Sequence, residues 1–272
     1  MQKAESKSLS QLPQTITIGS KDSDIKLRPR ISIVIPVHNE EENIAFSLSR
    51  INHVLNSVLP DYEILLVNDG SNDNTLALIH QQQNNDPHLR VISYSLNKGK
   101  GHAIKTGVLR SSGKVIVFLD GDRDVSPLTL RDYIKELETC DLVIASKRHP
   151  LSIVNAPISR KFLSRGFNLL VRIMLGIKIK DTQSGLKAGD GDALRRIFKS
   201  VAVKRYAFDV ELLAIANAFD LKIKEMPIDI TLNSRFKISE ITKMFIDVIA
   251  VFYRYRIKRT YQKRRESHTE IL

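Results

Sequence analysis

The segment Lys114-Val-Ile-Val-Phe-Leu-Asp120-Gly-Asp122-Arg-Asp124 places three carboxylates directly after a run of apolar residues. The apolar run is typical of a buried parallel strand, and its abrupt end indicates the carboxyl edge of a sheet. If the chain stays extended, its period of two points Asp120, Asp122 and Asp124 toward the same side. Crowded like charges are unfavourable unless a cation lies among them, and carboxylate oxygens suit Mg²⁺ or Mn²⁺. A polar loop that merely closes a strand is the alternative, so the neighbouring motifs have to decide.

Composition narrows the class of protein. The 272-residue chain is 42% hydrophobic and 26% charged, as expected for a globular protein with a substantial core. Its single cysteine, Cys140, excludes an intramolecular disulfide and a cysteine metal cluster. We expect neither a signal peptide nor a transmembrane helix, because no apolar run is long enough. The net charge of +12 indicates an anionic partner: nucleic acid, an anionic membrane or a phosphorylated substrate.

Hydrophobic periodicity predicts strands that alternate with helices in the first half of the chain. We expect strands at 31–37, 62–67, 90–95, 114–119 and 141–145, with helices at about 40–57, 74–83, 100–110 and after Pro127. Such alternation predicts a mostly parallel sheet covered on both faces. Further on, we expect helices at 160–175, 190–198, 209–219 and 239–259, with an extended segment at 222–231.

Two of these helices, 160–175 and 239–259, mix apolar and basic residues. Packing on the core and lying on a membrane are both open to such helices. Seven basic residues follow from Arg254 to Arg265 with no acid among them. A charge run of this kind is also consistent with a solvated tail.

Four predicted strands lead into polar clusters at the same edge of the sheet. The clusters are Pro36-Val-His-Asn-Glu40, Asn68-Asp-Gly-Ser71, Asn97-Lys-Gly-Lys-Gly101 and Asp120-Gly-Asp122. Their convergence fits a nucleotide site in a doubly wound fold, and the glycine-lysine cluster could approach phosphate closely. A flexible turn is the alternative for that cluster. Neither a Walker A pattern nor Gly-x-Gly-x-x-Gly after the first strand is present.

The order of these motifs resembles that of family 2 glycosyltransferases with the GT-A fold. Three later motifs, Asp181–Lys187, Phe208–Leu212 and Asn233–Phe236, resemble the polyprenyl-phosphate branch, the dolichyl-phosphate glucosyl- and mannosyltransferases. The resemblance spans about residues 31–240. It implies an α/β, Rossmann-like GT-A fold: a mostly parallel sheet flanked by helices, with a C-terminal amphipathic helix.

The resemblance also suggests how the chain is organised. Residues 1–29 are polar and read as a disordered arm. Residues 30–232 would form the GT-A domain. Residues 233–272 would supply a donor-site loop, a membrane-proximal amphipathic helix and a basic tail.

The implied reaction is an inverting transfer of a hexose from a nucleotide-diphosphate sugar to a polyprenyl (dolichyl) phosphate. UDP-glucose is favoured as donor and GDP-mannose comes next. The resemblance assigns Pro36, His38, Glu40 and Asp69 to base and ribose, with Lys98 and Lys100 close by. Asp122, together with Asp124 or Asp120, would bind Mg²⁺ or Mn²⁺ at the diphosphate, and Asp120 could instead contact the ribose or sugar.

On the acceptor side, the resemblance assigns phosphate contacts to Arg148, Arg160 and Ser164. Arg235 would lie on a loop that closes over the diphosphate, where the family more often has lysine. Surface ion pairs are the alternative for these arginines. The motif residues Asp181, Asp209 and Glu211 fit direct catalysis and loop-fixing equally well.

A lipid acceptor requires membrane contact, so we expect a peripheral protein on the cytoplasmic face of a membrane, anchored by the two amphipathic helices. Members of this branch often carry transmembrane segments or act with a membrane-embedded partner, and such a partner stays open here. Three other functions are alternatives. A catalytically inactive scaffold is disfavoured because Asp69, Asp120 and Asp122 are intact. A family 2 transferase with a polysaccharide or other soluble acceptor would use the same donor site. A nucleic-acid-binding protein would explain the charge, but no nucleic-acid module is visible, so we expect no nucleic-acid partner.

Overall fold

The structure, a computed structural model, describes residues 31–59, 61–119, 129–183, 185–203, 205, 207–232 and 238–269. The predicted arm at 1–29 lies outside these residues, as do Asp120, Asp122, Asp124 and Arg235. The domain limits at 30–232 and 233–272 stay predictions.

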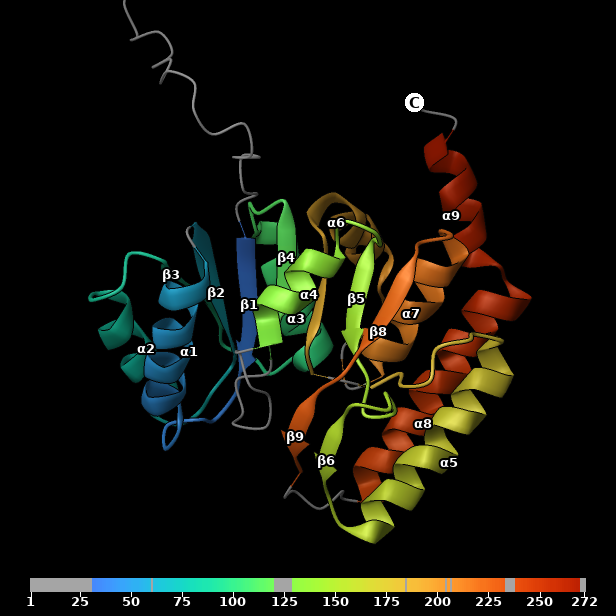
Figure 1. Cartoon of the computed structure of the whole chain (residues 1–272), viewed down its shortest axis with the longest axis horizontal. Helices are drawn as coiled ribbons and strands as arrows, with labels where there is room; N and C mark the ends of the chain where they lie inside the picture. The colour runs from blue at the N-terminus through green and yellow to red at the C-terminus, as the bar shows by residue number, and fades with distance from the viewer. Residues whose placement is uncertain are drawn as a thin grey trace, which may run out of the picture.

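In the described part of the chain, seven strands form one sheet in the order β3-β2-β1-β4-β7-β5-β8 (Figure 1). The strands are β1 (Ile31–Val37), β2 (Tyr62–Asp69), β3 (Leu89–Tyr94), β4 (Val115–Phe118), β5 (Leu142–Ala145), β7 (Lys187–Asp190) and β8 (Ile223–Met226). All neighbouring pairs are parallel except the two that β7 makes with β4 and β5. The predicted mostly parallel sheet is therefore confirmed. Strands β6 (Ile153–Asn155) and β9 (Asp229–Thr231) form a separate parallel pair.

Helices cover both faces of the sheet because alternate residues of its strands enter two different cores. On β1, Ile33 and Ile35 enter the core shared with three helices, α1 (Ile44–Val58), α2 (Thr75–Gln83) and α4 (Leu130–Glu136). Val34 enters the opposite core. That second core includes α3 (Lys100–Arg110), α5 (Ile158–Leu175), α6 (Gly191–Ser200), α7 (Phe208–Ala218) and α8 (Ile238–Phe252).

The basic C-terminal segment is folded onto this second core. The predicted helix at 239–259 changes after Phe252 into a π-helical turn, η2 (Tyr253–Ile257), and a further helix, α9 (Thr260–Thr269), follows. Tyr255 and Tyr261 are only 6% and 1% exposed. The segment as far as Tyr261 is thus part of the packed protein rather than a solvated tail. None of the helices in the described residues is long and apolar enough to cross a membrane.

Glu63 on β2 fixes the amino-terminal end of the sheet from inside the protein. Its Oε1 accepts hydrogen bonds from the Ser32 hydroxyl at 2.7 Å and from the Ser112 amide at 2.7 Å. Its Oε2 lies 2.5 Å from Nη1 of Arg90. Burial by itself would raise the pKa of Glu63, but the hydrogen bonds from Ser112, Ser32 and Arg90 outweigh it and lower the pKa to about 2.

This lowered pKa predicts an acid-dependent loss of stability. The Glu63 carboxylate stabilises the fold fully above its ordinary pKa of 4.5, and the contribution is lost as the pH falls toward 2. Glu63→Gln should lower the free energy of unfolding at pH 7 by about 3 kcal/mol and flatten its decline between these pH values. Denaturant unfolding at several pH values measures this, with the exposed Glu138→Gln as control. An unchanged acid profile in Glu63→Gln would contradict the account.

Candidate active site

The loops after β1 and β2 are joined to each other at the carboxyl edge of the sheet. The Asn39 amide donates to Oγ of Ser71 at 3.0 Å, and the Glu40 amide donates to Oγ1 of Thr75 at 2.8 Å. In return, the Asn72 amide donates to the Asn39 side chain at 2.9 Å. The structure thus brings together two of the four polar clusters predicted from the sequence.

Asp69 joins the third polar cluster, the glycine-lysine loop at Asn97–Gly101, to the end of β2. Its Oδ1 accepts hydrogen bonds from the Tyr94 hydroxyl at 2.7 Å and from the Lys98 amide at 2.8 Å. Its Oδ2 accepts one from the Gly99 amide at 2.8 Å. Asp69 is only 3% exposed. Burial of Tyr94 and its hydrogen bond to the Asp69 carboxylate raise the pKa of Tyr94 well above its usual range. The carboxylate therefore fixes the glycine-lysine loop against β2 and β3.

Glycine is required where these loops meet. Gly70 has φ +65°, and a Cβ there would lie 2.6 Å from the backbone nitrogen of Asn97. An L-residue would be strained at this φ and would clash with the glycine-lysine loop. Asn97–Gly99 is accordingly a loop held by Asp69, and Lys100 and Gly101 begin α3, so the cluster is not a flexible turn.

The other predicted donor-site residues lie at this edge with different exposures. Pro36 and Glu40 are half-buried, and His38 is exposed. Lys98 is exposed, with its Nζ 5.1 Å from the centre of the Tyr94 ring, and Lys100 at the start of α3 is half-buried. Their contacts to a nucleotide stay predictions.

The predicted metal ligands Asp120, Asp122 and Asp124 lie outside the described residues, as does Arg235. Leu119, just before the aspartates, donates its amide to the Val34 carbonyl at 3.1 Å, so β4 reaches the edge beside β1. Three carboxylates suit a hard divalent ion by their donor chemistry. Elsewhere, no group of three or more His, Cys, Asp or Glu side chains in the described ranges could hold a metal ion.

A second set of predicted residues meets at the loop after β5. Nη2 of Arg148 donates to the main-chain carbonyl of Ser164 on α5 at 3.0 Å, and burial lowers the pKa of Arg148. Arg160, one turn earlier on α5, is half-buried like Ser164. The structure therefore brings Arg148 to the inward side of α5. The contact is to the main-chain carbonyl of Ser164. The prediction concerned the side chains of Arg148, Arg160 and Ser164, which were assigned to the acceptor phosphate.

Asp181 organises the loop that carries Arg148. Its Oδ2 accepts the Lys147 amide at 2.8 Å and lies 2.9 Å from the Lys147 Nζ. Its Oδ1 accepts the Gln183 amide at 3.1 Å. Because Asp181 is 1% exposed, this geometry matches the loop-fixing interpretation of the residue.

Glu211 has the same kind of role beneath the glycine-lysine loop. It is fully buried, and its Oε2 accepts the Ala202 and Val203 amides at 2.8 and 2.6 Å. Its Oε1 accepts hydrogen bonds from Arg254 at 2.9 Å and from the Tyr261 hydroxyl. The loop at Ala202 and Val203 packs closely against Gly101, where a Cβ would lie 2.9 Å from the Val203 carbonyl oxygen. The C-terminal segment thus reaches the glycine-lysine loop through Glu211.

Sequence reasoning missed Lys187, which is 2% exposed on β7. Its Nζ donates to Oδ1 of Asp209 at 2.7 Å, and its backbone pairs with Phe118 at the end of β4. Removing one partner of a buried ion pair usually costs about 3–5 kcal/mol. A lysine between the apolar residues Leu186 and Ala188 was the available signal, but no strand had been predicted there.

Comparison with solved structures defines the class of protein. Glucosyl-3-phosphoglycerate synthase from Mycobacterium tuberculosis, solved with Mn²⁺, UDP and glucosyl-3-phosphoglycerate, matches 83% of this chain and 79% of that chain. The TM-score is 0.62 at 22% sequence identity. This is the likeness of an α/β protein with the GT-A fold, as expected from the sequence.

Sequence comparison then gives the family. Residues 32–198 match glycosyl transferase family 2. A dolichyl-phosphate beta-glucosyltransferase of Trichomonas vaginalis is 34% identical over 82% of this chain and 71% of its own length. An undecaprenyl-phosphate mannosyltransferase of Micrococcus luteus is 32% identical over 73% of this chain and 82% of its own length. The chain belongs to glycosyltransferase family 2 and is a glycosyltransferase.

The role of Asp69 gives a direct test of the loop geometry. In Asp69→Asn, one oxygen is replaced by an amide group that cannot accept the Gly99 hydrogen bond. Losing a buried charge-assisted hydrogen bond costs about 1.5–3 kcal/mol, so the Lys98 and Gly99 amides should exchange hydrogen at least about tenfold faster. Tyr94→Phe removes one neutral donor and should have a smaller effect. Unchanged amide exchange in Asp69→Asn would show that the carboxylate does not fix the loop.

Proposed function

We propose that this glycosyltransferase moves a hexose from a nucleotide-diphosphate sugar to a polyprenyl phosphate, with UDP-glucose as preferred donor and GDP-mannose next. One observation carries the lipid acceptor: Arg148 meets the inward side of α5, whose outward side is apolar and exposed. The Arg148 loop and α5 together thereby offer a cation to a phosphate and an apolar surface to a hydrocarbon chain. The two relatives described above, named for polyprenyl-phosphate acceptors, support the same proposal.

For the donor, we assign base and ribose recognition to Pro36, His38, Glu40 and Asp69. Three of the four bonding positions of the Asp69 carboxylate are occupied by the Tyr94 hydroxyl and two loop amides. One acceptor position is left for an N–H or O–H group of the nucleotide. Lys98 and Lys100 add positive charge beside it, which favours a diphosphate.

We assign a divalent ion to Asp122, with Asp124 or Asp120. When bound, Mg²⁺ or Mn²⁺ would neutralise the charge that develops on the leaving nucleotide diphosphate. Structures of the glucosyl-3-phosphoglycerate synthase that shares the fold contain Mn²⁺ or Mg²⁺ together with UDP, which supports this assignment. Arg235 would add a second positive charge at the same diphosphate, and its planar guanidinium suits two phosphate oxygens.

The acceptor needs guidance more than activation. A phosphate monoester is largely doubly ionised near neutral pH, so one of its oxygens can attack without a strong general base. The new bond joins this oxygen to the anomeric carbon from the face opposite the leaving group. The bond to the nucleotide diphosphate breaks, and the configuration inverts. Arg148, Arg160 and Ser164 would hold the phosphate in line for this attack.

We further propose that α5 and α8, which pack side by side (Figure 1), rest on the cytoplasmic surface of a membrane. The outward side of α5 exposes Ile158, Phe162, Leu169 and Ile173. The outward side of α8 and its continuation exposes Phe245, Ile249, Tyr253 and Ile257. Exposed Lys161, Arg165 and Arg172 accompany the apolar residues of α5, as in helices that bind anionic bilayers.

The proposed reaction is tested with purified protein, Mn²⁺ or Mg²⁺, labelled nucleotide sugars and polyprenyl phosphate in detergent. We expect a butanol-extractable glycolipid, formed faster from UDP-glucose than from GDP-mannose and abolished by chelation. Asp122→Asn should slow the reaction on the order of hundredfold or more, whereas the exposed Asp192→Asn should not. If no donor yields glycolipid, the lipid acceptor is wrong. Labelled polysaccharide or soluble product would then favour the other acceptor class.

The proposed membrane surface is tested with a matched pair of variants. Phe162 on α5 is 66% exposed, and Phe46 on α1, a helix on the other face of the sheet, is 58% exposed. Burying a phenylalanine side chain contributes about 1.5–3 kcal/mol, so Phe162→Ser should weaken liposome binding about tenfold or more. Phe46→Ser should change it little. Equal liposome binding by the two variants in sedimentation would place the membrane contact elsewhere.

A further inference from the structure

The basic residues of the C-terminal segment fall into two sets. Arg254 is directed inward, with its Nε 3.1 Å and its Nη2 2.9 Å from Oε1 of the buried Glu211. Five others have exposed side chains: Arg256, Lys258, Arg259, Lys263 and Arg264. Arg254 stabilises the fold, whereas the exposed basic side chains lie at the protein surface.

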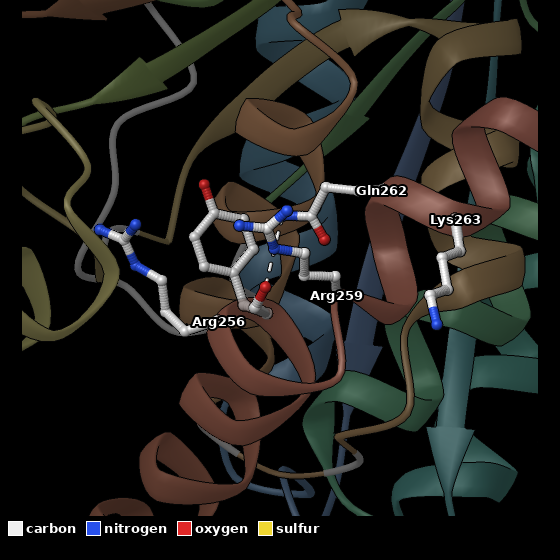
Figure 2. A pocket seen from close by; sticks show the side chains of 5 residues that line it. Arg256, Arg259, Gln262 and Lys263 are labelled. Atoms are coloured by element: carbon white, nitrogen blue, oxygen red, sulfur yellow. Dashed lines mark hydrogen bonds between the residues drawn. The ribbon is translucent and has the colours of Figure 1, made fainter.

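The exposed cations line two adjoining cavities around the start of α9. One has a volume of about 440 Å³ and is lined by Tyr255, Arg256, Arg259, Gln262 and Lys263 (Figure 2). The other has a volume of about 630 Å³ and is lined by Ile257, Lys258, Thr260, Lys263 and Arg264. Lys263 belongs to both, and neither lining contains an acid among the described residues. The two cavities together are called the cationic hollow below.

The floor of the cationic hollow is rigid. The Tyr255 hydroxyl accepts a hydrogen bond from Nδ2 of Asn217 on α7 at 2.6 Å. The Gln262 side chain donates to the Tyr255 carbonyl at 3.3 Å, the bond drawn in Figure 2. Arg256 lies over Gly176 at the end of α5, where a Cβ would meet its guanidinium. The floor is therefore part of the packed protein, and the cations extend from folded backbone.

The occupant follows from charge and position. The positive side chains and the amino-terminal turn of α9 together favour an anion. Ile249, Tyr253 and Ile257 follow one another at intervals of four along the exposed side of α8 and η2. Ile257 also lines the cationic hollow. The hollow is therefore continuous with the apolar surface that we assigned to the membrane.

We propose that the cationic hollow binds the phosphate of an anionic lipid headgroup at the membrane surface. This inference rests on the proposed membrane contact of α5 and α8, and it adds a defined headgroup site at their carboxyl-terminal ends. The site lies apart from the residues assigned to the acceptor phosphate, so it sets the orientation of the protein on the bilayer and takes no part in the transfer.

The test compares two triple variants that remove the same three positive charges. Lys258→Gln/Arg259→Gln/Lys263→Gln alters the hollow, and Arg131→Gln/Lys135→Gln/Lys199→Gln alters exposed cations on α4 and α6. The probes are phosphatidylcholine vesicles with and without phosphatidylglycerol. Each basic residue near an anionic surface contributes about fivefold in binding, so the hollow variant should lose at least about tenfold on the anionic vesicles. The control should lose less than about threefold.

Three results would overturn the proposal. Equal losses in the two variants would mean that net charge alone drives binding, and no loss in the hollow variant would mean that the hollow does not touch lipid. Equal binding of the wild-type protein to vesicles with and without phosphatidylglycerol would mean that the hollow does not recognise an anionic headgroup. If the triple variant unfolds, Lys258→Gln/Lys263→Gln, which leaves the turn at Arg259 intact, gives the same comparison.

The detergent assay separates this inference from the proposed function. The hollow variant should form glycolipid from polyprenyl phosphate in detergent within about twofold of the wild-type rate, because no bilayer is present. Wild-type protein that forms no glycolipid would refute the proposed reaction, while the vesicle comparison would still decide the headgroup site.

Discussion

Buried carboxylates that accept hydrogen bonds from loop amides are the constraint on which this structure depends. Asp69 binds the Lys98 and Gly99 amides, Asp181 binds those of Lys147 and Gln183, and Glu211 binds those of Ala202 and Val203. Loops at strand ends have many unpaired amides, and a charged acceptor in a low-dielectric interior holds them strongly. The polar clusters converge because parallel strands end at one edge, and the buried acceptors then hold the loops around that edge in position. Without them, the glycine-lysine loop and the Arg148 loop would have no fixed positions.

The sequence predicted the elements whose pattern is local. β1 and α3 have the predicted limits, 31–37 and 100–110, because apolar alternation and helical periodicity are complete within each segment. β7 was missed because Lys187-Ala-Gly-Asp190 is short and lacks β-branched residues, and it exists only by pairing between β4 and β5. The break after Phe252 was missed because the apolar and basic pattern continues through η2 into the positive φ of Arg259.

The candidate site likewise has features that the sequence predicted and features that it did not. Motif order predicted that Asn39, Asp69 and the glycine-lysine loop lie at one edge, since strand ends in a parallel sheet meet there. The roles of Asp181, Asp209 and Glu211 could not be chosen from the sequence, because their partners Lys147, Lys187 and Tyr261 lie 22 to 50 residues away. α5 joins the two halves of the proposed function. Its inward side meets Arg148, and its outward side carries the apolar residues that we assign to the membrane.

The central claim is that the carboxyl edge of β1, β2 and β4 is the donor site. A crystal structure of the protein with UDP and Mn²⁺ tests it most directly. The account predicts the base and ribose beside Glu40 and Asp69, with the diphosphate and metal at Asp122. UDP bound away from this edge, for example in the cationic hollow, or an Asp122 carboxylate far from the metal, would contradict it.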